Sequence, residues 1–416
     1  MKETRSTEWK KAVSNSFLKT VSAFANFNGG SIVFGVADDG SVEGLDDLAS
    51  SCLAIENKIN DSISPKPLFA LKTNESDKTV TLTVEDSPDK PYLYKGKAYR
   101  RSDTADIEVD ALELRRLVLA GQNLRFEDLP SSKNDLTFTA LEKKLVSEHV
   151  VDSLNNDVLR TLNLLDPSTG FNNAALIVSD QNSFPGIDIA KFGSTIDIIA
   201  DRVLFEGLSA IRQFELACEM FERYYSVEII EGATRAKHRT VPFEAFREAV
   251  ANAIAHRTWD VGARIRIAMH PDRIEVTSPG GLPSGLSEGE YLKGFVSELR
   301  NPILAGVLFR LNIIEMFGTG ITRIRNAYAE FEQKPFFEVS ANAIRVTLPV
   351  INKKRALSAD ETVVYEFLKT TVPVSSSTIS KEVGFGKDKT IGILKSLVEK
   401  RYVEKTGTGR GTRYQA

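Results

Sequence analysis

Cysteine and histidine are scarce in this chain, whose 416 residues include two cysteines and four histidines. Cys52 and Cys218 lie far apart in apolar stretches, which predicts two buried thiols, and with so few scattered histidines no Cys/His metal site can be assembled. No segment reaches eighteen consecutive apolar residues, and no signal-peptide stretch follows Met1. We therefore expect a cytoplasmic protein without membrane contact.

An excess of positive charge is also missing. The chain has 53 Lys and Arg against 56 Asp and Glu, which gives a net charge of −3 and excludes a uniformly basic nucleic-acid binder. Any nucleic-acid binding must come from local patches. The length and the 42% share of hydrophobic residues predict roughly two to four globular domains.

A polar ridge on one helix is the most informative feature that is present. Glu248, Asn252 and His256 are spaced by four, so their side chains lie on one helical face. The opposite stripe is apolar and must be buried, and it consists of Phe246, Ala249, Val250, Ala253 and Ile254. This pattern predicts a helix that covers a sheet and turns its ridge toward a cleft.

Two glycine turns follow this helix. Ser278-Pro-Gly-Gly281-Leu-Pro283 comes after a predicted strand, Arg273–Thr277, and Gly318-Thr-Gly320 comes before a helical run. Backbone can approach a phosphate closely at such glycines, and the amides at a helix start favour an anion.

The order of helix, SPGG turn and GTG turn resembles the ATP site of the GHKL superfamily, and is closest to its divergent branch in transcriptional regulators, whose "REAL-NA-HR" helix is similar to Arg247–Arg257. The resemblance implies an α/β sandwich that binds ATP and Mg²⁺. Asn252 would hold the metal, Glu248 would be the catalytic residue that orients or deprotonates water, and Gly318 and Gly320 would wrap the phosphates. The remaining implied nucleotide contacts are His256, Ser278, Gly280, Gly281 and Thr319. Ser278 stands where the superfamily has an aspartate that accepts a hydrogen bond from the adenine amino group, and a hydroxyl accepts more weakly.

The N-terminal region predicts a helix over Trp9–Phe27, a strand over Ser31–Val36, a tight turn at Asp38–Gly40, and a strand pair formed by Thr79–Val84 and Ala98–Arg101. The segment Thr20–Val36, with its A-F-A-N-x-x-G-G core, resembles the AlbA-type domain of the Schlafen family, also called a divergent AAA domain. The resemblance covers residues 1–118 and implies contact with nucleic acid, with phosphate contacts at Lys10, Lys11, Arg100 and Arg101. The alternative is an ordinary solvated basic edge.

Some Schlafen proteins cleave RNA with three acidic residues, which would correspond here to Glu3, Glu8 and Asp38. Converging carboxylates could bind a divalent metal and activate water. Asp38 also suits the first position of a turn without any catalytic role.

Residues 119–165 predict a helical connector, and residues 166–350 the ATPase-like domain, whose front strands would be Phe171–Val178 and Thr195–Ala200. Residues 357–416 predict three helices and a glycine-rich hairpin, the pattern of a winged helix-turn-helix. From residue 381 onward nine Lys or Arg oppose four Asp or Glu, which fits DNA binding. The predicted DNA contacts are Lys387, Lys389, Thr390, Lys395, Lys405, Arg410 and Arg413. A winged helix used as a protein interaction module is the alternative.

Together these patterns predict an α/β (α+β) multidomain protein that acts as a DNA-binding transcriptional regulator, with a GHKL-like domain that senses a nucleotide or serves as a scaffold. An ATP-hydrolysing DNA-associated protein and a metal-dependent nuclease acting on RNA are the two alternatives. If the winged helix binds a palindrome, a symmetric homodimer is expected.

Overall fold

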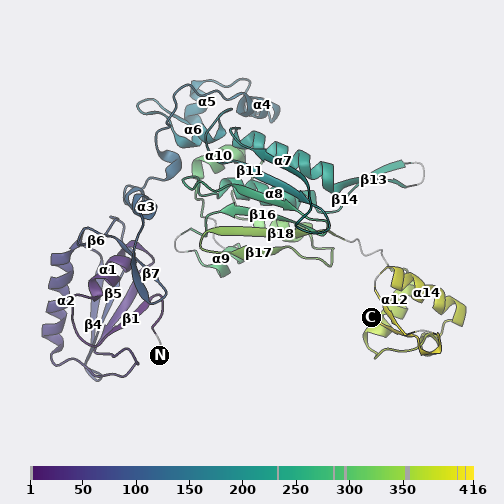
Figure 1. The fold of residues 1–416 in the computed structure, drawn as a ribbon, viewed down its shortest axis with the longest axis horizontal. Helices are drawn as coiled ribbons and strands as arrows, with labels where there is room; N and C mark the ends of the chain where they lie inside the picture. Colours follow the sequence, from purple (N-terminus) through teal and green to yellow (C-terminus); the bar gives the residue numbers. More distant parts are fainter. Residues whose placement is uncertain are drawn as a thin grey trace. The chain divides into compact units, whose positions relative to one another are not determined.

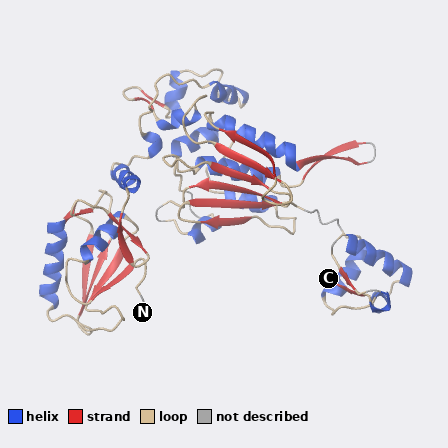
Figure 2. Ribbon diagram, viewed as in Figure 1, coloured by secondary structure: helices blue, strands red, loops and turns tan. Residues whose placement is uncertain are grey.

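The computed structural model describes residues 3–231, 234–283, 286–294, 298–351, 357–400, 402–407 and 409–416. Helices and several sheets alternate along the chain (Figures 1 and 2), which confirms the mixed α/β class. The chain divides into two compact units: Met1–Ala327 with Pro335–Pro349, and Tyr328–Lys334 with Val350–Ala416. Within the described ranges no helix combines the length and the apolar character needed to cross a membrane.

The N-terminal part is a four-stranded sheet in the order β1-β2-β5-β4, in which β1 and β2 are parallel and the other neighbours antiparallel. Helices α1 and α2 bury Phe17, Val21 and Ile55 against sheet residues such as Ile32 and Leu82. The elements are β1 (Thr7–Lys10), α1 (Phe17–Asn26), β2 (Gly30–Phe34), α2 (Leu48–Ser62), β3 (Ile63–Ser64), β4 (Phe69–Asn74), β5 (Thr79–Val84), β6 (Leu93–Tyr94), β7 (Tyr99–Ser102), β8 (Ala105–Glu108) and α3 (Ala111–Gly121).

The A-F-A-N-x-x-G-G motif is explained by packing. Asn26 accepts a hydrogen bond from Tyr92 N at 2.8 Å and donates one to Tyr92 O at 2.9 Å, and Ser22 donates to the same carbonyl at 2.7 Å. A Cβ at Gly30 would lie 2.5 Å from the Phe24 ring. The motif therefore ties α1 to the segment before β6, and its residues have structural roles.

Two predictions for this region are wrong. The first helix does not begin at Trp9, because Thr7–Lys10 is a strand that pairs with β2, and the helix starts only at Phe17. Strand β5 pairs with β2 and β4, whereas β7 pairs with β8. The distant pairing of β1 with β2 decided the first outcome and the local β7–β8 hairpin the second, and neither pairing can be read from helical spacing.

Short helices and two minimal strands occupy the connector, residues 119–165, and the start of the region that follows it: η1 (Phe126–Asp128), α4 (Thr139–Ser147), α5 (Asn156–Thr161), β9 (Leu165–Asp166), β10 (Gly170–Phe171) and α6 (Asn173–Val178). The predicted strand over Phe171–Val178 is wrong, since most of it is the buried helix α6, which Asn172 caps by accepting from Ala175 N. A short apolar run does not distinguish a strand from a buried helix by periodicity.

A six-stranded sheet in the order β12-β11-β15-β16-β18-β17 forms the centre of the next part (Figure 1). Only β11 and β15 pair in parallel among these strands. Helix α8 lies over β16, and it packs against α7 through stacked Phe246 and Phe221. The elements are β11 (Ile187–Phe192), β12 (Ile199–Phe205), α7 (Ala210–Tyr225), β13 (Ser226–Glu231), β14 (Thr234–Arg239), α8 (Phe243–Ala255), β15 (Ile265–Met269), β16 (Arg273–Pro279), α9 (Glu288–Lys293), α10 (Pro302–Arg310), α11 (Gly320–Ala327), β17 (Phe336–Val339) and β18 (Ala343–Pro349). The strand predicted at Thr195–Ala200 starts later, at Ile199.

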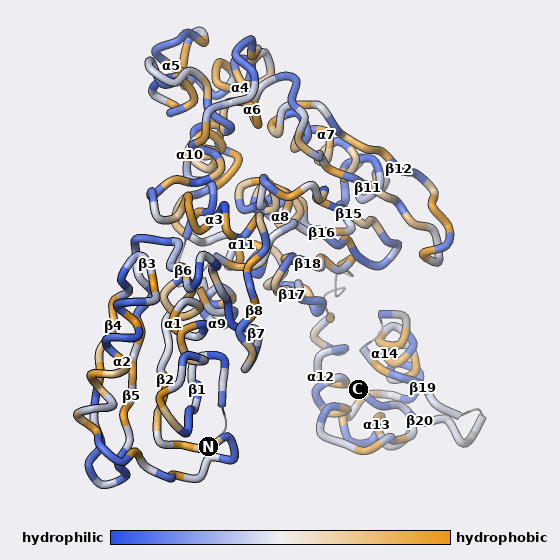
Figure 3. Tube along the Cα trace, turned by 60° about the vertical axis from the view of Figure 1, so that its left-hand side comes forward, coloured by the Kyte–Doolittle hydropathy of each residue, from blue (hydrophilic) through white to orange (hydrophobic). Residues whose placement is uncertain are grey.

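In its described residues, the second unit contains the helices α12, α13 and α14 and a short hairpin, β19 and β20, around a core that includes Val364, Leu368, Ile379 and Leu394. Hydropathy alternates along α14 (Figure 3), as expected for a helix with one buried face. The elements are α12 (Ala359–Lys369), α13 (Ser376–Val383), α14 (Lys387–Glu399), β19 (Glu404–Thr406), η2 (Gly409–Gly411) and β20 (Arg413–Gln415).

Candidate functional site

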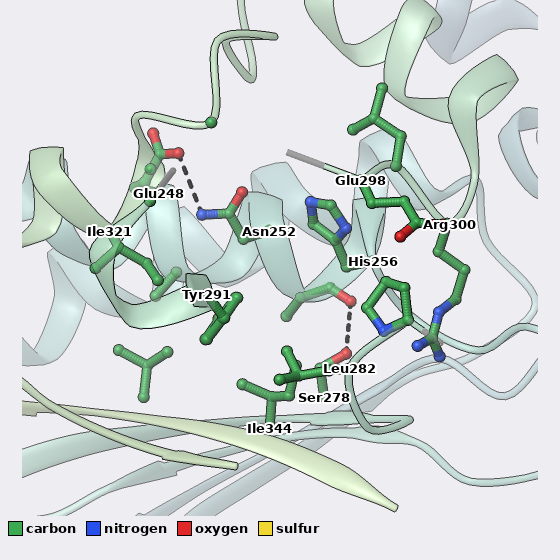
Figure 4. Close-up of a pocket in the computed structure, with 18 of the residues that line it drawn as sticks. Glu248, Asn252, His256, Ser278, Leu282, Tyr291, Glu298, Arg300, Ile321 and Ile344 are labelled. Carbon is green, nitrogen blue, oxygen red and sulfur yellow. Dashed lines mark hydrogen bonds between the residues drawn. The ribbon is translucent and has the colours of Figure 1, made fainter. Parts of the chain in front are cut away.

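A pocket opens between α8, the strands β16 and β18, and the segments before α10 and α11 (Figure 4). It encloses about 1040 Å³, including its open mouth. Val276, Ile344 and Val346 from the sheet supply an apolar floor, and the ridge of α8 supplies a polar wall. An apolar cleft with a few convergent polar groups is the usual form of a small-molecule site.

Glu248 and Asn252 of α8 and His256, which caps the C-terminus of this helix, all line the pocket, as their spacing predicts. Asn252 donates a hydrogen bond through Nδ2 to Glu248 Oε1 at 3.2 Å (Figure 4). The amide oxygen of Asn252 is therefore left as an acceptor, which is the atom that a hard cation such as Mg²⁺ would need.

Burial controls the charges of the ridge. Glu248 is 3% exposed, and burial raises its pKa, an effect opposed by the nearby Arg323 and by the Asn252 hydrogen bond. Burial, together with the Arg300 charge, lowers the pKa of His256 to about 4. His256 is thus neutral near pH 7, and the raised pKa of Glu248 makes it a better proton acceptor than an exposed carboxylate.

The hydroxyl of Ser278 has a fixed direction. Its Oγ donates to the carbonyl oxygen of Ala253, in the last turn of α8, at 2.9 Å (Figure 4). Because a hydroxyl has one proton, the Ser278 oxygen accepts from a ligand in the pocket as long as the bond to Ala253 is kept. In this arrangement it can receive an amino group, and donation to a ligand carbonyl would require the bond to Ala253 to break.

Close approach explains the glycine at the start of α11. A Cβ on Gly320 would lie 2.6 Å from Asn252 Nδ2 and 2.7 Å from Glu248 Oε1. Gly280 has φ +106°, and its Cβ would collide with Thr258. Gly281, Gly318 and Gly320 line the pocket, whereas Gly280 and Thr319 are not among its lining residues; the Thr319 carbonyl accepts from Arg323 N at 2.8 Å.

Other lining residues were not predicted. Arg300 contacts the Thr258 hydroxyl and donates to Gly281 O at 2.6 Å, and burial lowers its pKa. Glu298 and Tyr291 also line the pocket, and burial raises the pKa of Tyr291 to about 12. Arg300 begins an Arg-Asn-Pro sequence, and no local pattern indicates that its side chain lines the pocket.

The predicted basic surface of the N-terminal region is largely ion-paired. Arg101 is not a surface residue: its side chain is 4% exposed and pairs with Glu8 and with Asp106, so the predicted phosphate contact there is wrong. Lys10 pairs with Glu8, Lys11 with Glu43 at 2.8 Å, and Arg100 with Glu113 at 3.1 Å. Sequence shows the charge of Arg101 but not its burial.

The carboxylates of the nuclease alternative have separate surroundings. Glu8 is buried among cations, and Glu3 accepts from Trp9 N at 2.8 Å. Asp38 is exposed in the turn at 38–40, as its alternative reading predicts. Across the described ranges no cluster of three or more His, Cys, Asp or Glu could hold a metal ion. The convergence that the nuclease alternative requires is therefore not found for these three residues.

In the second unit, the predicted contacts Lys387, Lys389, Lys395, Lys405 and Arg413 are exposed. Lys389 pairs with Asp360 at 2.8 Å. Thr390 is fully buried and donates to Gly386 O at 3.1 Å within α14, so the predicted DNA contact at Thr390 is wrong. The side chain of Arg410 lies outside the described residues.

Cys52 and Cys218 are half-buried instead of fully buried.

The six-stranded sheet, the covering helices and the ridge define an ATPase-like α/β domain, which an N-terminal α+β domain precedes in the sequence. The comparisons agree: residues 3–110 match the family model "Schlafen, AlbA_2", and residues 262–348 match "Putative ATP-dependent DNA helicase recG C-terminal". The second match includes β15–β18 and both glycine turns but not α8. The fold is similar to the crystal structure of the DIP2311 protein from Corynebacterium diphtheriae, at 17% identity and a TM-score of 0.50, over 99% of this chain and 92% of that chain. The comparison with curated proteins gave no match.

Proposed function

We propose that this chain is a DNA-binding transcriptional regulator whose ATPase-like domain, residues 166–350, binds ATP with Mg²⁺ as a signal. The observation that carries the nucleotide part is the acceptor-only oxygen of Ser278 above an apolar floor. An adenine ring presents an amino donor at its edge, whereas guanine presents a carbonyl at the equivalent position, so the site favours adenine.

The ridge fits the rest of the ligand. Asn252 offers its amide oxygen to Mg²⁺, and the amides at the start of α11, brought close by Gly320, suit a phosphate. The bound metal would neutralise phosphate charge, while Glu248 would hold Asn252 in orientation. Glu248 and Asn252 would thus form the metal-binding part of the pocket together.

The DNA part of the proposal rests on the tail. We propose that residues 357–416 form a winged helix-turn-helix in which α14 enters the major groove and the β19–β20 hairpin contacts the backbone. Lys387 and Lys395 are exposed on α14, and Lys405 and Arg413 are exposed on the hairpin strands. The match of residues 3–110 to the Schlafen AlbA model supports a further nucleic-acid contact there.

Calorimetric titration tests the nucleotide part. Wild-type protein is titrated with ATP and GTP, with and without Mg²⁺, beside Asn252→Ala and a control, Asn74→Ala, which lies in the N-terminal sheet. We expect ATP to bind more tightly than GTP, and Asn252→Ala to lose the Mg²⁺-dependent binding. If wild type binds no nucleotide at millimolar concentration, the nucleotide part of the proposal is wrong and the domain is a scaffold.

ATP hydrolysis is the second candidate, and the buried Glu248 favours it. Its raised pKa suits a general base that takes a proton from water. Phosphate release measured with wild type and Glu248→Gln decides between sensing and turnover. Binding that persists in Glu248→Gln while release stops would favour the ATPase.

A further inference from the structure

Glu127, in the connector, is a buried carboxylate outside the pocket. It is fully buried in η1, and both of its oxygens accept backbone hydrogen bonds from the first turn of α10: Oε1 from Ile303 N at 2.7 Å and Oε2 from Leu304 N at 2.9 Å. It is separated by about 175 residues of sequence from that turn. A carboxylate at a helix N-terminus is favoured by the free amides and by the helix dipole.

The residues immediately before this turn belong to the pocket. Arg300 lines it and binds Gly281 O, which lies in the SPGG turn. Asn301 is buried and donates to Ala255 O and Arg257 O, both at 2.8 Å, which caps the end of α8 beside His256. Glu127 thus binds the first turn of α10, and Asn301, the residue before that turn, binds the end of α8.

An aromatic series connects the same connector segment to the pocket rim. Phe126 contacts Phe184 edge to face at 5.9 Å between centroids, and Phe184 contacts Trp259 in the same way at 5.5 Å. Trp259 follows Thr258, the hydroxyl partner of Arg300. Two adjacent residues of η1 therefore reach the same end of the pocket through separate contacts.

We propose that Glu127 is a positioning residue of the nucleotide pocket, which fixes Arg300 and Asn301 through the first turn of α10. The inference rests on the proposed nucleotide site for its effect on affinity. Its effect on local structure does not depend on a ligand. The connector thereby links the shape of the pocket to the segment that leads from the N-terminal domain.

Protonation of Glu127 would weaken this support. Burial raises its pKa to about 7, opposed by the two backbone hydrogen bonds. The charged groups that act on it are Asp128 and Arg125 of its own segment; α10 presents amides to it, and α6 contains no charged residue. A protonated carboxyl accepts strongly through only one oxygen, so protonation of Glu127 removes one of its two hydrogen bonds to α10. Nucleotide affinity should therefore fall as pH drops below about 7. Nucleotide binding near this pH should release a proton from Glu127.

The test compares full-length wild type, Glu127→Gln and a control, Asp128→Asn, whose carboxylate accepts a hydrogen bond from Arg125 N at 2.7 Å in the same segment. Hydrogen exchange of the ligand-free proteins is measured by mass spectrometry over residues 255–260 and 299–304. ATP affinity is then measured from pH 6 to 8. We expect Glu127→Gln to exchange faster in both segments, to bind about tenfold more weakly, and to lose the part of the pH dependence that wild type shows beyond the titration of ATP itself. Asp128→Asn should keep wild-type exchange in both segments, and because it removes a charge that raises the pKa of Glu127, its fall in affinity should begin at a lower pH than in wild type.

Unchanged exchange at residues 255–260 in Glu127→Gln would overturn the inference. If wild type binds no nucleotide, the proposed function fails, and the exchange result alone decides the positioning role. If Glu127→Gln does not fold, wild type at pH 6 and pH 8 replaces it: faster exchange in the two segments at pH 6, after correction for the intrinsic rate, supports the inference, and equal protection contradicts it.

Discussion

The substitution Gly320→Ala tests whether the start of α11 must lie close to the ridge of α8, separately from its effect on helix stability. The added Cβ would lie 2.6 Å from Asn252 Nδ2 and 2.7 Å from Glu248 Oε1, far inside van der Waals contact. Gly320 is the first residue of α11 and has no left-handed φ, so alanine fits its backbone and should favour the helix by up to about 1 kcal/mol. Overpacking a tight contact costs about 1–3 kcal/mol. With the full gain in helix propensity, the net destabilisation stays below about 2 kcal/mol, while the ridge must move.

The assay pairs thermal unfolding with calorimetric titration of ATP and Mg²⁺. We expect nucleotide affinity to fall by about tenfold or more, which corresponds to about 1.4 kcal/mol of binding free energy, with only a small shift in Tm. Gly289→Ala in α9 is the matched control, since a Cβ there meets nothing within 4 Å. Wild-type affinity in Gly320→Ala would refute the reasoning that α11 must contact the ridge so closely.

Three further predictions concern the rest of the chain. Glu8→Gln should destabilise the N-terminal domain by about 3 kcal/mol in urea unfolding, because buried Arg101 keeps only Asp106 as its carboxylate partner; unchanged stability would contradict the buried pair. Burial raises the pKa of Cys218 to about 12, so iodoacetamide at pH 8 should leave this thiol unmodified in the folded protein, and rapid labelling seen by mass spectrometry would show that the thiol is accessible. Deletion of residues 357–416 should remove most DNA affinity in a fluorescence-anisotropy titration, and undiminished affinity would place DNA binding in the N-terminal domain.

The ridge of α8 could be predicted from sequence because its geometry is local. A spacing of four sets the shared face of Glu248, Asn252 and His256 whatever the rest of the chain does. The apolar stripe opposite was also predicted correctly, since Phe246, Ala249, Val250, Ala253 and Ile254 are all buried. Local periodicity was therefore sufficient for the helix and for one wall of the pocket.

Features that depend on distant partners could not be predicted in this way. Arg300 and Glu127 reach their positions through contacts across the chain, and no periodic pattern marks them. Arg101 and Thr390 have residue types that suit DNA contact, but the first is buried by Glu8 and Asp106 and the second by the turn of α14. Residue type indicates which chemistry is available, and burial decides whether it can be used.

The pairing of β16 with β18 also sets the order in which the pocket can form. Val276 and Ser278 lie opposite Val346 and Ile344 in the register, so the apolar floor combines segments about 70 residues apart in sequence. Closing so long a loop is slow compared with forming a helix such as α8. During synthesis, the side of β16 that faces β18 stays unpaired until Pro349 has left the ribosome. Exposed strand edges of this kind are prone to aggregation. The pairing of β18, the last strand of the domain, therefore both completes the pocket and covers the exposed edge of the nascent sheet.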